Sequence, residues 1–279
     1  MQTKDYLKYF LHRAQAWFSV PQATLIGLKQ RAYGVDMSRY QGTFNPAAAV
    51  PGLLDFGIIK ATEGTTYKDP EFENFYPGIS QLTAQGAFHY LKSNVSGVSQ
   101  ANWFLDTIAG KKFHMLVMDF ERYSNVMNDA FVHVLYDALV RVSTSRPEAK
   151  TLIYTNAEIY NNVIYPAALR IWGRDVFTDW DLFIAQYPYL VNVDGEPVMP
   201  KNRADWKLWQ FSNAGIAAEH GTKYPVDRDV FNGGVSAFKT WLNIAQPPPP
   251  PVQSLPDMKV VLGDNVTYEQ QTVILKAKQ

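Results

Sequence analysis

Residues 116–121 read Leu116-Val117-Met118-Asp119-Phe120-Glu121, and this stretch decides the fold that we predict. Together with Met115, its apolar residues form a short run that is typical of a strand buried on both faces. Side chains alternate along a strand, so Asp119 and Glu121 point to the same side, with their Cα atoms about 6.6 Å apart. A charged pair at the end of a buried strand is costly unless the strand opens into a polar site. The stretch therefore predicts two carboxylates that face a polar site.

Similar apolar runs occur along most of the chain, and helix-like stretches separate several of them. The predicted strands span residues 33–36, 56–61, 86–91, 115–121, 151–154, 182–187 and 207–211, and the predicted helices include 96–109 and 129–143. Strands that alternate with helices indicate an α/β protein with a parallel sheet or barrel. Several of the runs end in a polar or charged residue, and the C-terminal ends of the strands are where a (β/α) barrel carries its active site.

The composition excludes several classes of protein. Lys+Arg and Asp+Glu both number 26, so the formal net charge is zero and the chain lacks the basic excess of a nucleic-acid-binding protein. The absence of cysteine excludes disulfides, thiol catalysis and cysteine-ligated zinc. No window holds 18 uninterrupted apolar residues, so we expect neither a transmembrane helix nor membrane insertion. A length of 279 residues with 47% hydrophobic content is enough for one large α/β domain and additional segments.

We predict four parts in the chain. They are an N-terminal helical extension at 1–33, a catalytic barrel at 34–245, a proline-rich linker at 246–252 and a short C-terminal tail at 253–279. Apolar residues recur every three or four positions between Leu7 and Phe18, which predicts an amphipathic helix in the extension. The unbroken prolines 247–251 indicate a stiff polyproline II spacer. The tail holds two β-like stretches, 258–262 and 272–275, and we expect it to serve attachment, oligomerisation or binding.

Two neighbouring carboxylic acids are the groups that glycoside hydrolysis requires. One acid protonates the leaving oxygen, and the second group stabilises the oxocarbenium-like transition state or the species that follows it. Neighbouring carboxylates push their pKa values apart, which keeps one of them protonated. Asp-x-Glu pairs are common on protein surfaces, so it is the position of Asp119 and Glu121 behind an apolar strand that makes this pair informative.

Six motifs in a fixed order connect this pair to a known family. They are GVDMSRYQG at 34–42, IKATEG at 59–64 with YKDP at 67–70, MDFE at 118–121, IAQY at 184–187, LWQF at 208–211 and VDRDVFNG at 226–233. Through these motifs, most of residues 34–242 resembles the lysozymes of glycoside hydrolase family 25, the N-acetylmuramidases of phages and of some bacteria and fungi.

The resemblance implies an irregular, TIM-like (β/α) barrel of the β5α5β3 type, which needs no metal and no cofactor. It implies cleavage of the β-1,4 bond between N-acetylmuramic acid and N-acetylglucosamine in the peptidoglycan of bacterial cell walls. By resemblance, Glu121 is the general acid, and Asp119 stabilises the developing charge or orients the substrate's acetamido group. Asp36, which we count among the catalytic residues, and Asp227 are similar to further acids that line the cleft of the family.

Five further residues are candidates for substrate binding, namely Tyr90, Tyr187, Trp209, Lys60 and Glu63. Tyr187 and Trp209 lie at predicted strand ends, where stacking on a sugar ring and plain packing are equally expected. Lys60 and Glu63 either form a salt bridge at the rim of the cleft or contact the substrate. The sequence leaves both pairs of alternatives open.

The chain departs from the family pattern at two positions. Phe88 stands where the family commonly has Tyr, and Tyr90, on the same strand face, is the candidate to supply the missing hydroxyl. Asp229 stands where the family usually has Asn, which adds an acid that could alter the pH optimum. His89 is expected to be a satisfied structural histidine and not a catalyst.

Two other functions remain open on the sequence: a chitinase-type glycosidase and a non-catalytic peptidoglycan-binding protein. Chitinase-type barrels carry further aspartates upstream on the Asp-x-Glu strand, where this chain has Met115 and Val117. The presence of Asp36, Asp119 and Glu121 together argues against a binder that has lost its catalytic site.

The expected mechanism and setting follow from the same resemblance. We expect retention of configuration, with the substrate's own acetamido group as the nucleophile. The N-terminal residues lack the apolar core of a secretory signal, so we expect no signal peptide. The protein is then either a phage endolysin, which is released from the host cytoplasm to the cell wall, or a lysin carried on a phage tail. In the second setting the terminal segments attach it to the phage particle or to another copy.

Overall fold

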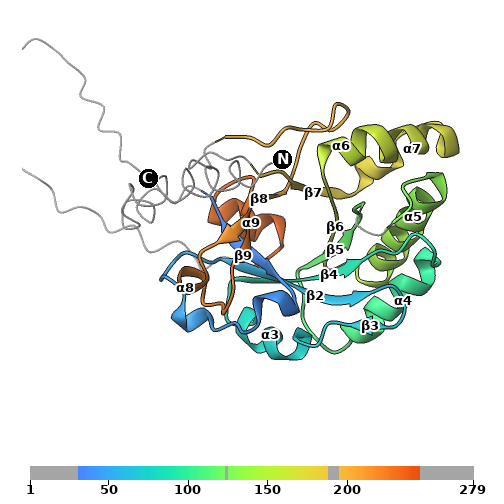
Figure 1. Ribbon diagram of the computed structural model, residues 1–279. Coiled ribbons are helices and arrows are strands. Elements are labelled where there is room, and N and C mark those ends of the chain that lie inside the picture. Colours follow the sequence, from blue (N-terminus) through green and yellow to red (C-terminus); the bar gives the residue numbers. More distant parts are fainter. Residues whose placement is uncertain (1–30, 123–124, 188–194, 246–279) are drawn as a thin grey trace, which may run out of the picture. The chain divides into compact units, whose positions relative to one another are not determined.

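We describe the protein from a computed structural model, in which the described residues are 31–122, 125–187 and 195–245 (Figure 1). The predicted linker and tail, and all of the predicted N-terminal extension except residues 31–33, lie outside these ranges. Within them the chain forms a closed barrel of strands with helices around it, which confirms the α/β barrel predicted from the sequence. No helix in the described part is long and apolar enough to cross a lipid bilayer.

The elements of the described residues are short, as the predicted runs indicated. The strands are β1 (Tyr33–Met37), β2 (Phe56–Glu63), β3 (Tyr67–Lys68), β4 (Ala84–Tyr90), β5 (Met115–Asp119), β6 (Lys150–Thr155), β7 (Asp181–Ala185), β8 (Leu208–Gly215) and β9 (Val226–Phe231). The α-helices are α3 (Phe72–Ile79), α4 (Gly97–Thr107), α5 (Asp129–Ser145), α6 (Ala157–Ile159), α7 (Tyr165–Trp172), α8 (Ala217–His220) and α9 (Val235–Trp241). Short 3-10 helices span Arg39–Gln41, Pro46–Ala48 and Val176–Asp179, and a π-helical turn spans Tyr160–Ile164.

Eight strands of the described residues close the barrel, and β3 pairs only with β2 at its edge. The order β1-β2-β4-β5-β6-β7-β8-β9 returns to its start because β1 pairs with both β2 and β9. Neighbouring strands from β1 to β8 are parallel, whereas β9 is antiparallel to both β8 and β1. The C-terminal ends of the parallel strands and the N-terminal end of β9 therefore meet at one rim.

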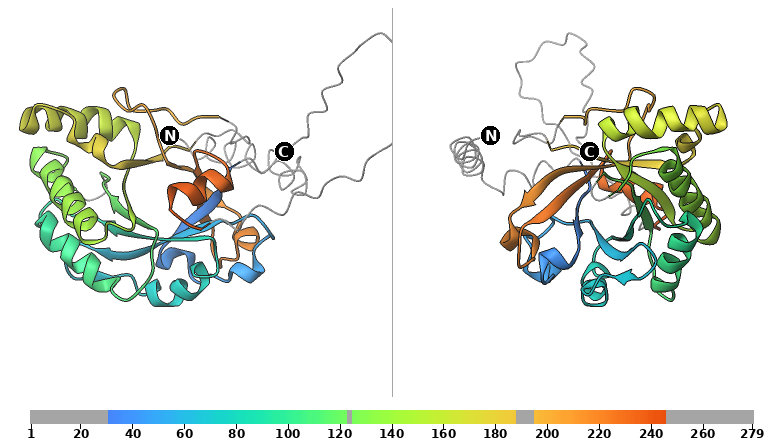
Figure 2. Two further views of the ribbon diagram at one scale, coloured as in Figure 1. Left: turned by 180° about the vertical axis from the view of Figure 1, so that it is seen from behind. Right: turned by 45° about the vertical axis from the view of Figure 1, so that its right-hand side comes forward.

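The connections follow the β5α5β3 pattern that the family resemblance implied. Helical segments follow β1, β2, β4, β5 and β6, whereas the described part of the chain from β7 to β9 contains only the short α8. Figures 1 and 2 show α3, α4, α5 and α7 in an arc outside the strands β2 to β6. Helix α5 illustrates why these segments are helical. Asn128 caps it by accepting the N–H of Phe131 at 3.0 Å, and Leu135 and Leu139 lie on its buried face.

Along each strand, the residues that point into the barrel change from apolar to polar toward this rim. On β5, Met115 and Val117 belong to the inner apolar cluster, and Asp119 follows them on the same side. The inner rows of other strands repeat the change: Ile58 and Lys60 on β2, Leu152 and Tyr154 on β6, and Leu208 and Gln210 on β8. The alternate residues, such as Leu116, join a larger cluster with the apolar faces of the helices. The sequence thus fills the barrel floor with apolar groups and leaves polar groups at the rim.

Helix α9 packs against the inner apolar cluster. Its Phe238 ring lies 5.1 Å, between centroids, from the rings of both Phe56 and Phe231. Phe56 also explains a glycine on the neighbouring strand, because a Cβ at Gly34 would lie 2.3 Å from the Phe56 ring. The floor of the barrel is therefore packed with apolar rings.

The strands and helices predicted within the described residues are present, with two differences in detail. The strand that holds Asp119 was expected to continue to residue 121, but β5 ends at Asp119 and Glu121 lies in the loop that follows. Phe120 keeps the alternation of the strand, because it is fully buried on the helix side, stacks on Phe131 of α5 with ring centroids 4.2 Å apart and donates its N–H to the carbonyl of Tyr154 at 2.9 Å. Glu121 therefore still faces the pocket together with Asp119. In addition, β9 was expected only as a motif and not as a strand.

Candidate active site

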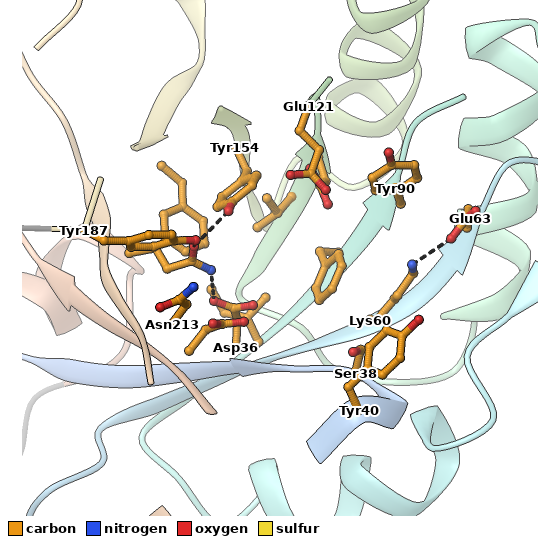
Figure 3. Close-up of a pocket in the computed structure, with 17 residues that line it drawn as sticks. Asp36, Ser38, Tyr40, Lys60, Glu63, Tyr90, Glu121, Tyr154, Tyr187 and Asn213 are labelled. Carbon is orange, nitrogen blue, oxygen red and sulfur yellow. Dashed lines mark hydrogen bonds and ion pairs between the residues drawn. The ribbon is translucent and has the colours of Figure 1, made fainter. Parts of the chain in front are cut away.

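A pocket of about 380 Å³ opens at the rim where the polar side chains gather (Figure 3). Its volume lies within the roughly 300–1,000 Å³ that is usual for small-molecule sites. It is lined by Asp36, Ser38, Tyr40, Ile58, Lys60, Glu63, Phe88, Tyr90, Val117, Asp119, Glu121, Tyr154, Phe183, Tyr187, Gln210, Asn213 and Asp227. All of the residues predicted for the site from the sequence are among them except Trp209.

Four carboxylic acids meet in this pocket although they are far apart in the sequence. Asp36 comes from β1, Asp119 from the last position of β5, Glu121 from the loop after β5, and Asp227 from β9. Asp36 and Asp227 are direct partners in the β1–β9 pairing. Asp36 is 9% exposed and Asp119 is 7% exposed, so these carboxyl groups have little contact with water.

Burial raises the pKa of these acids because it disfavours the charged form. It raises the pKa of Asp36 to about 6, and a hydrogen bond from Gln210 limits the rise. It raises the pKa of Asp227 to about 8, and the charges of Asp36 and Glu121 add to the rise. Asp227 is therefore protonated at neutral pH, while Asp36 is largely ionised.

The Asp119–Glu121 pair is shifted in the same direction. Burial, with the charge of Glu121, raises the pKa of Asp119 well above its ordinary range. Burial also raises the pKa of Glu121, while the nearby cation of Lys60 opposes the rise. Two neighbouring carboxyl groups in one pocket do not both ionise freely, so this arrangement favours keeping a proton on the pair. A bound proton at this position is what a general acid requires.

One oxygen of Asp119 lacks a hydrogen-bond donor. Its carboxyl group lines the pocket, yet none of the described residues donates to Oδ1. A buried acceptor without a donor costs free energy unless a ligand or a water supplies one. The Asp119 carboxyl group thus has unused capacity to accept a hydrogen bond beside the pocket.

Gln210 makes three side-chain hydrogen bonds on one side of the pocket. Its Nε2 donates to Asp36 Oδ2 at 2.5 Å. Its Oε1 accepts from the hydroxyls of Tyr154 at 2.8 Å and Tyr187 at 2.5 Å. The side chain is 3% exposed, so the network fixes both tyrosine rings beside the acids.

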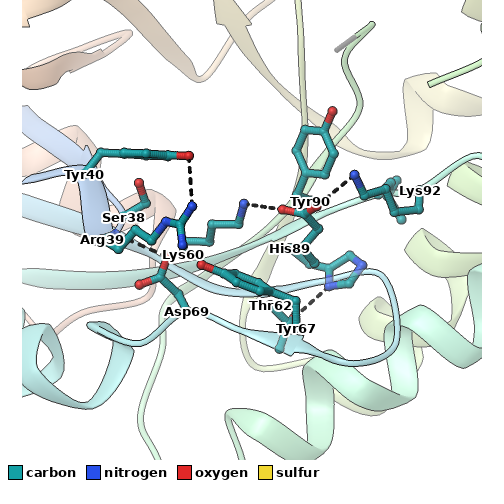
Figure 4. Close-up of polar contacts among 12 residues, drawn as sticks. Ser38, Arg39, Tyr40, Lys60, Thr62, Tyr67, Asp69, His89, Tyr90 and Lys92 are labelled. Carbon is teal, nitrogen blue, oxygen red and sulfur yellow. Dashed lines mark hydrogen bonds and ion pairs between the residues drawn. The ribbon is translucent and has the colours of Figure 1, made fainter. Parts of the chain in front are cut away.

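Lys60 and Glu63 line the opposite side, where they form a salt bridge, one of the two alternatives that the sequence left open (Figure 3). Figure 4 shows Lys60, Lys92 and Tyr90 there. Glu63 accepts from Lys60 Nζ at 2.8 Å and from Lys92 Nζ at 2.8 Å. Both ammonium groups lie over the Tyr90 ring, at 5.0 Å and 4.9 Å from its centroid. The ring of Tyr90 is thereby held at the pocket, next to Phe88, which also lines it.

His89 is structural, as expected. It is fully buried, with Nδ1 at 2.7 Å from Thr62 Oγ1 and Nε2 at 3.3 Å from Gln100 Oε1. Burial lowers the pKa of His89 to about 4, so the ring is neutral at physiological pH. It faces away from the pocket and holds β2, β4 and α4 together.

Trp209 is the one predicted site residue that the structure removes from the pocket. It is 2% exposed, its Nε1 donates to the carbonyl of Gln186 at 2.8 Å, and its ring packs edge-on against Trp206. Its neighbour Gln210 points into the barrel, and successive residues of a strand point to opposite faces. Trp209 therefore packs in the core between strands and helices and cannot stack on a sugar.

Several lining residues were not predicted as site residues, and Tyr40 is the most accessible of them. The Tyr40 side chain is 69% exposed at the mouth of the pocket and accepts a hydrogen bond from Arg39 at 3.2 Å (Figure 4). The other unpredicted lining residues are Ser38, Ile58, Phe88, Val117, Tyr154, Phe183, Gln210 and Asn213. The alternation of β6 and β8 was the signal that could have found Tyr154 and Gln210, because each is the inward residue that follows a buried inward leucine, Leu152 or Leu208.

A metal centre is not formed by these acids. Among the residues that the structure describes, no group of three or more His, Cys, Asp or Glu side chains is arranged to hold a metal ion. What the arrangement can do is hold protons on some carboxyl groups and negative charge on others within one small pocket.

Comparisons with known proteins agree with this geometry. The family model described as glycosyl hydrolases family 25 matches residues 35–220. Lysozyme M1 of Streptomyces globisporus is 29% identical over 218 residues, which cover 75% of this chain and 71% of that protein. A family 25 glycosyl hydrolase from Bacillus anthracis shares the fold, with a TM-score of 0.62 and 23% identity over 76% of this chain and 93% of that one. A muramidase from Trichobolus zukalii has a TM-score of 0.58 at 27% identity, over 77% of this chain and 100% of that one.

Proposed function

The chain belongs to the glycosyl hydrolases of family 25, and on that premise we propose that it cleaves the β-1,4 bond between N-acetylmuramic acid and N-acetylglucosamine in peptidoglycan. Its membership confirms the family inferred from the six sequence motifs and makes it a glycoside hydrolase of the muramidase type. The observation that carries the proposed reaction is the meeting of Asp119 and Glu121 in one pocket with Asp36 and Asp227.

Glu121 acts as the general acid in this proposal. Its carboxyl group lines the pocket and is less buried than that of Asp119, so a glycosidic oxygen can reach it. The pKa of Glu121 is raised by burial, which favours the protonated form that the first step consumes. Glu121 gives this proton to the leaving oxygen as the bond between that oxygen and C1 of the sugar breaks.

Asp119 orients the acetamido group of the substrate. It accepts a hydrogen bond from the acetamido N–H, which makes the acetamido carbonyl oxygen a better nucleophile toward C1. That oxygen bonds to C1 as the leaving oxygen departs, and a cyclic intermediate forms. Water then adds to C1 and gives a proton to Glu121, and the ring reopens to the acetamido group. The donor-free Oδ1 of Asp119 supports this role.

The mechanism has a stereochemical test. Attack by the acetamido oxygen followed by attack of water inverts C1 twice, so the product keeps the configuration of the substrate. Anomer-resolved NMR of the first product should show the β-anomer. An α-anomer as the first product would exclude the acetamido route and require direct attack by water.

The remaining lining residues bind the sugars in this proposal. Tyr187 and Tyr90 present aromatic rings from opposite sides of the pocket, and sugar C–H faces stack on such rings. Asp36 and Asp227 accept from or donate to sugar hydroxyls. Lys60 and Glu63 are already paired with each other, so their part is to hold the rim and to set the charge beside Glu121.

The structure disfavours the chitinase-type alternative. Met115 and Val117 occupy the inner row of β5 below Asp119, and both are buried in the apolar cluster. A chitinase-type strand would carry carboxylates there. Product formation distinguishes the proposed enzyme from a non-catalytic peptidoglycan-binding protein, which would form no product.

The identity of the cleaved bond tests the proposal. Purified peptidoglycan is digested, reduced with borohydride and hydrolysed to its sugars. Cleavage after N-acetylmuramic acid converts muramic acid to muramitol, whereas cleavage after N-acetylglucosamine yields glucosaminitol. We expect muramitol alone. Glucosaminitol would contradict the assigned bond, and wall binding without new reducing ends would show a non-catalytic protein.

The proposed setting is a phage lysin. The chain places a five-proline run at 247–251 and 28 further residues after the barrel, a layout that suits a tether to a wall or to a particle. We propose either release from an infected host as an endolysin or carriage on a phage tail. Mass spectrometry of purified virions and of cleared lysate tests this. Detection in virions supports the tail-borne form, detection only in the lysate supports the endolysin, and expression from uninfected cells contradicts both.

A further inference from the structure

Asp229 is a fully buried acid that the proposed reaction does not use. It is 0% exposed, and neither carboxyl oxygen has a hydrogen-bond donor among the backbone and side-chain N–H and O–H groups of the described residues. An ionised carboxylate in that position would be buried with no donor and no cation, which is among the most unfavourable states in a protein. Such a group keeps its proton instead.

The pairing of β9 with β1 places Asp229 near Asp36. Asp229 and Asp227 lie two residues apart on β9 and therefore face the same side of the sheet. Across from Asp229 stand Gly34 on β1 and Gln210 on β8, and Asp227 stands across from Asp36. Because Gly34 has no side chain, the carboxyl group of Asp229 can reach Asp36, its diagonal neighbour on β1. A hydrogen bond between two carboxyl groups requires a proton on one of them.

The surroundings assign that proton to Asp229. Asp36 already accepts from the amide of Gln210, and this bond favours its ionised form. Burial, with the charges of Asp36 and Asp227, raises the pKa of Asp229 well above its ordinary range. The pKa of Asp36 rises only to about 6, because the hydrogen bonds from Gln210 and Asp229 oppose the effect of burial.

We propose that Asp229 is a positioning residue: a neutral carboxylic acid that donates its hydrogen to Asp36, so that the two groups together carry one negative charge. Asp36 is thereby kept as an acceptor with a fixed orientation. This inference concerns the same pocket as the proposed function. The expected effect of Asp229 on hydrolysis rests on that function, whereas the proton on Asp229 does not.

The fixed Asp36 sets the direction of the whole network that reaches the pocket. The amide nitrogen of Gln210 must face Asp36, because its carbonyl oxygen would repel a carboxylate. The carbonyl oxygen of Gln210 consequently accepts from Tyr154 and Tyr187. Each tyrosine hydroxyl has a single hydrogen, so its oxygen is left to accept from a substrate hydroxyl or N–H. Without the hydrogen of Asp229, Asp36 loses one hydrogen-bond partner. The Gln210 amide can then turn over, so that the tyrosine hydroxyls no longer donate to it.

The proposal depends on every charged or titratable group that faces Asp229. The groups that act on Asp229 are Asp36 from β1 and Asp227 from β9 itself, and the neutral side chain of Gln210 stands across from it on β8. Among the described lining residues of the pocket the cation is Lys60 of β2, which acts on Asp119 and Glu121. The charges that act on Asp229 are thus those of two other acids, which favour its neutral form when they are ionised.

Two substitutions at position 229 distinguish the effect of the donated hydrogen from the effect of side-chain size. Asp229→Asn keeps the size and supplies an N–H to Asp36, and Asp229→Val has a similar size but no donor. Asp106→Asn, at an exposed acid of α4, is the matched control. The readouts are the melting temperature of the full chain between pH 5 and pH 8, and the initial rate of peptidoglycan hydrolysis.

The melting temperature tests the proton without any substrate. Folded Asp229 keeps a proton that the unfolded chain releases above its ordinary pKa, so its contribution to stability is lost as the pH rises. Both Asp229 variants should therefore lose less melting temperature between pH 5 and pH 8 than the wild type and the Asp106→Asn control. An unchanged pH dependence in Asp229→Asn would overturn the proposal, even if Asp229→Val did not fold.

The hydrolysis rate tests the positioning. Asp229→Val should be roughly tenfold or more slower than Asp229→Asn, because loss of one hydrogen bond to a charged group has an effect of about that size. Equal rates for the two variants would contradict the positioning role. A wild-type protein that does not hydrolyse peptidoglycan would refute the proposed function, and the melting data would still decide whether Asp229 holds the proton.

Discussion

Asp36 on β1 and Asp227 on β9 stand directly opposite each other in the antiparallel pairing that closes the barrel, and both side chains line the pocket. The two residues are brought together because β9 reverses direction relative to the other strands. Its start, and not its end, lies at the rim where the parallel strands end. The pairing therefore adds acids from the last strand to those that β1 and β5 deliver, and it explains why burial and mutual repulsion raise their pKa values.

The raised pKa of Asp227, about 8, predicts a pH-dependent stability. The folded protein keeps a proton on Asp227 that the unfolded chain releases above its ordinary pKa of 3.8. Stability from this group is thus complete below that value and is lost as the pH rises toward 8, by about 1.4 kcal/mol of unfolding free energy per pH unit for one retained proton. Asp227→Asn should flatten the decline between pH 5 and pH 8. Urea unfolding at each pH measures it, and curves parallel to those of the wild type would contradict the assignment.

Lys60 should set the alkaline limit of activity. Its ammonium group lowers the pKa of Glu121 against the effect of burial. Lys60→Met removes this charge, so Glu121 should keep its proton to higher pH. We expect the alkaline limb of the kcat/KM profile to move to higher pH. Lys92→Met is the matched control, because Lys92 also pairs with Glu63 but does not act on Glu121. A shift of the same size in both variants would contradict a specific effect of Lys60.

Loss of the Tyr40 side chain should affect KM, whereas loss of the Trp209 side chain should affect the unfolding free energy. Tyr40 is exposed at the mouth of the pocket, so Tyr40→Ala should raise KM for glycan chains roughly threefold to tenfold, through loss of stacking, with little change in melting temperature. Trp209 is buried in the core, so Trp209→Ala should lower the unfolding free energy by about 3–5 kcal/mol. Steady-state kinetics and urea unfolding of both variants check this. A raised KM in a fully stable Trp209→Ala protein would restore Trp209 to the site.

The sequence was sufficient for seven of the eight barrel strands in the described residues, all but β9, and for the acids Asp36, Asp119, Glu121 and Asp227. The run before Asp119 predicted β5 because its inward and outward residues are both apolar, and the family motifs supplied Asp36 and Asp227. The assignment of Trp209 to the site was wrong by one residue. On a strand a shift of one position exchanges the two faces, and the inward residue is Gln210.

Other parts of the site depend on the closure of the barrel. Gln210 connects Asp36 with Tyr154 and Tyr187, which come from three further elements. No local pattern in the sequence contains that information, because the contacts form only when β8 lies between β7 and β9. The same holds for Asp229, whose lack of donors becomes visible only when its neighbours are in place.

The most direct test of the account is the rate of muramitol formation from purified peptidoglycan by Glu121→Gln. Glutamine keeps the size of the side chain but has no proton to give to the leaving oxygen. We expect an unchanged melting temperature and circular dichroism spectrum, and a rate lower by roughly 10²–10⁴-fold, the usual contribution of general acid–base catalysis. Glu158→Gln, at an exposed glutamate after β6, should retain the wild-type rate. A Glu121→Gln protein that forms muramitol at the wild-type rate would contradict the assignment of Glu121 as the catalytic acid.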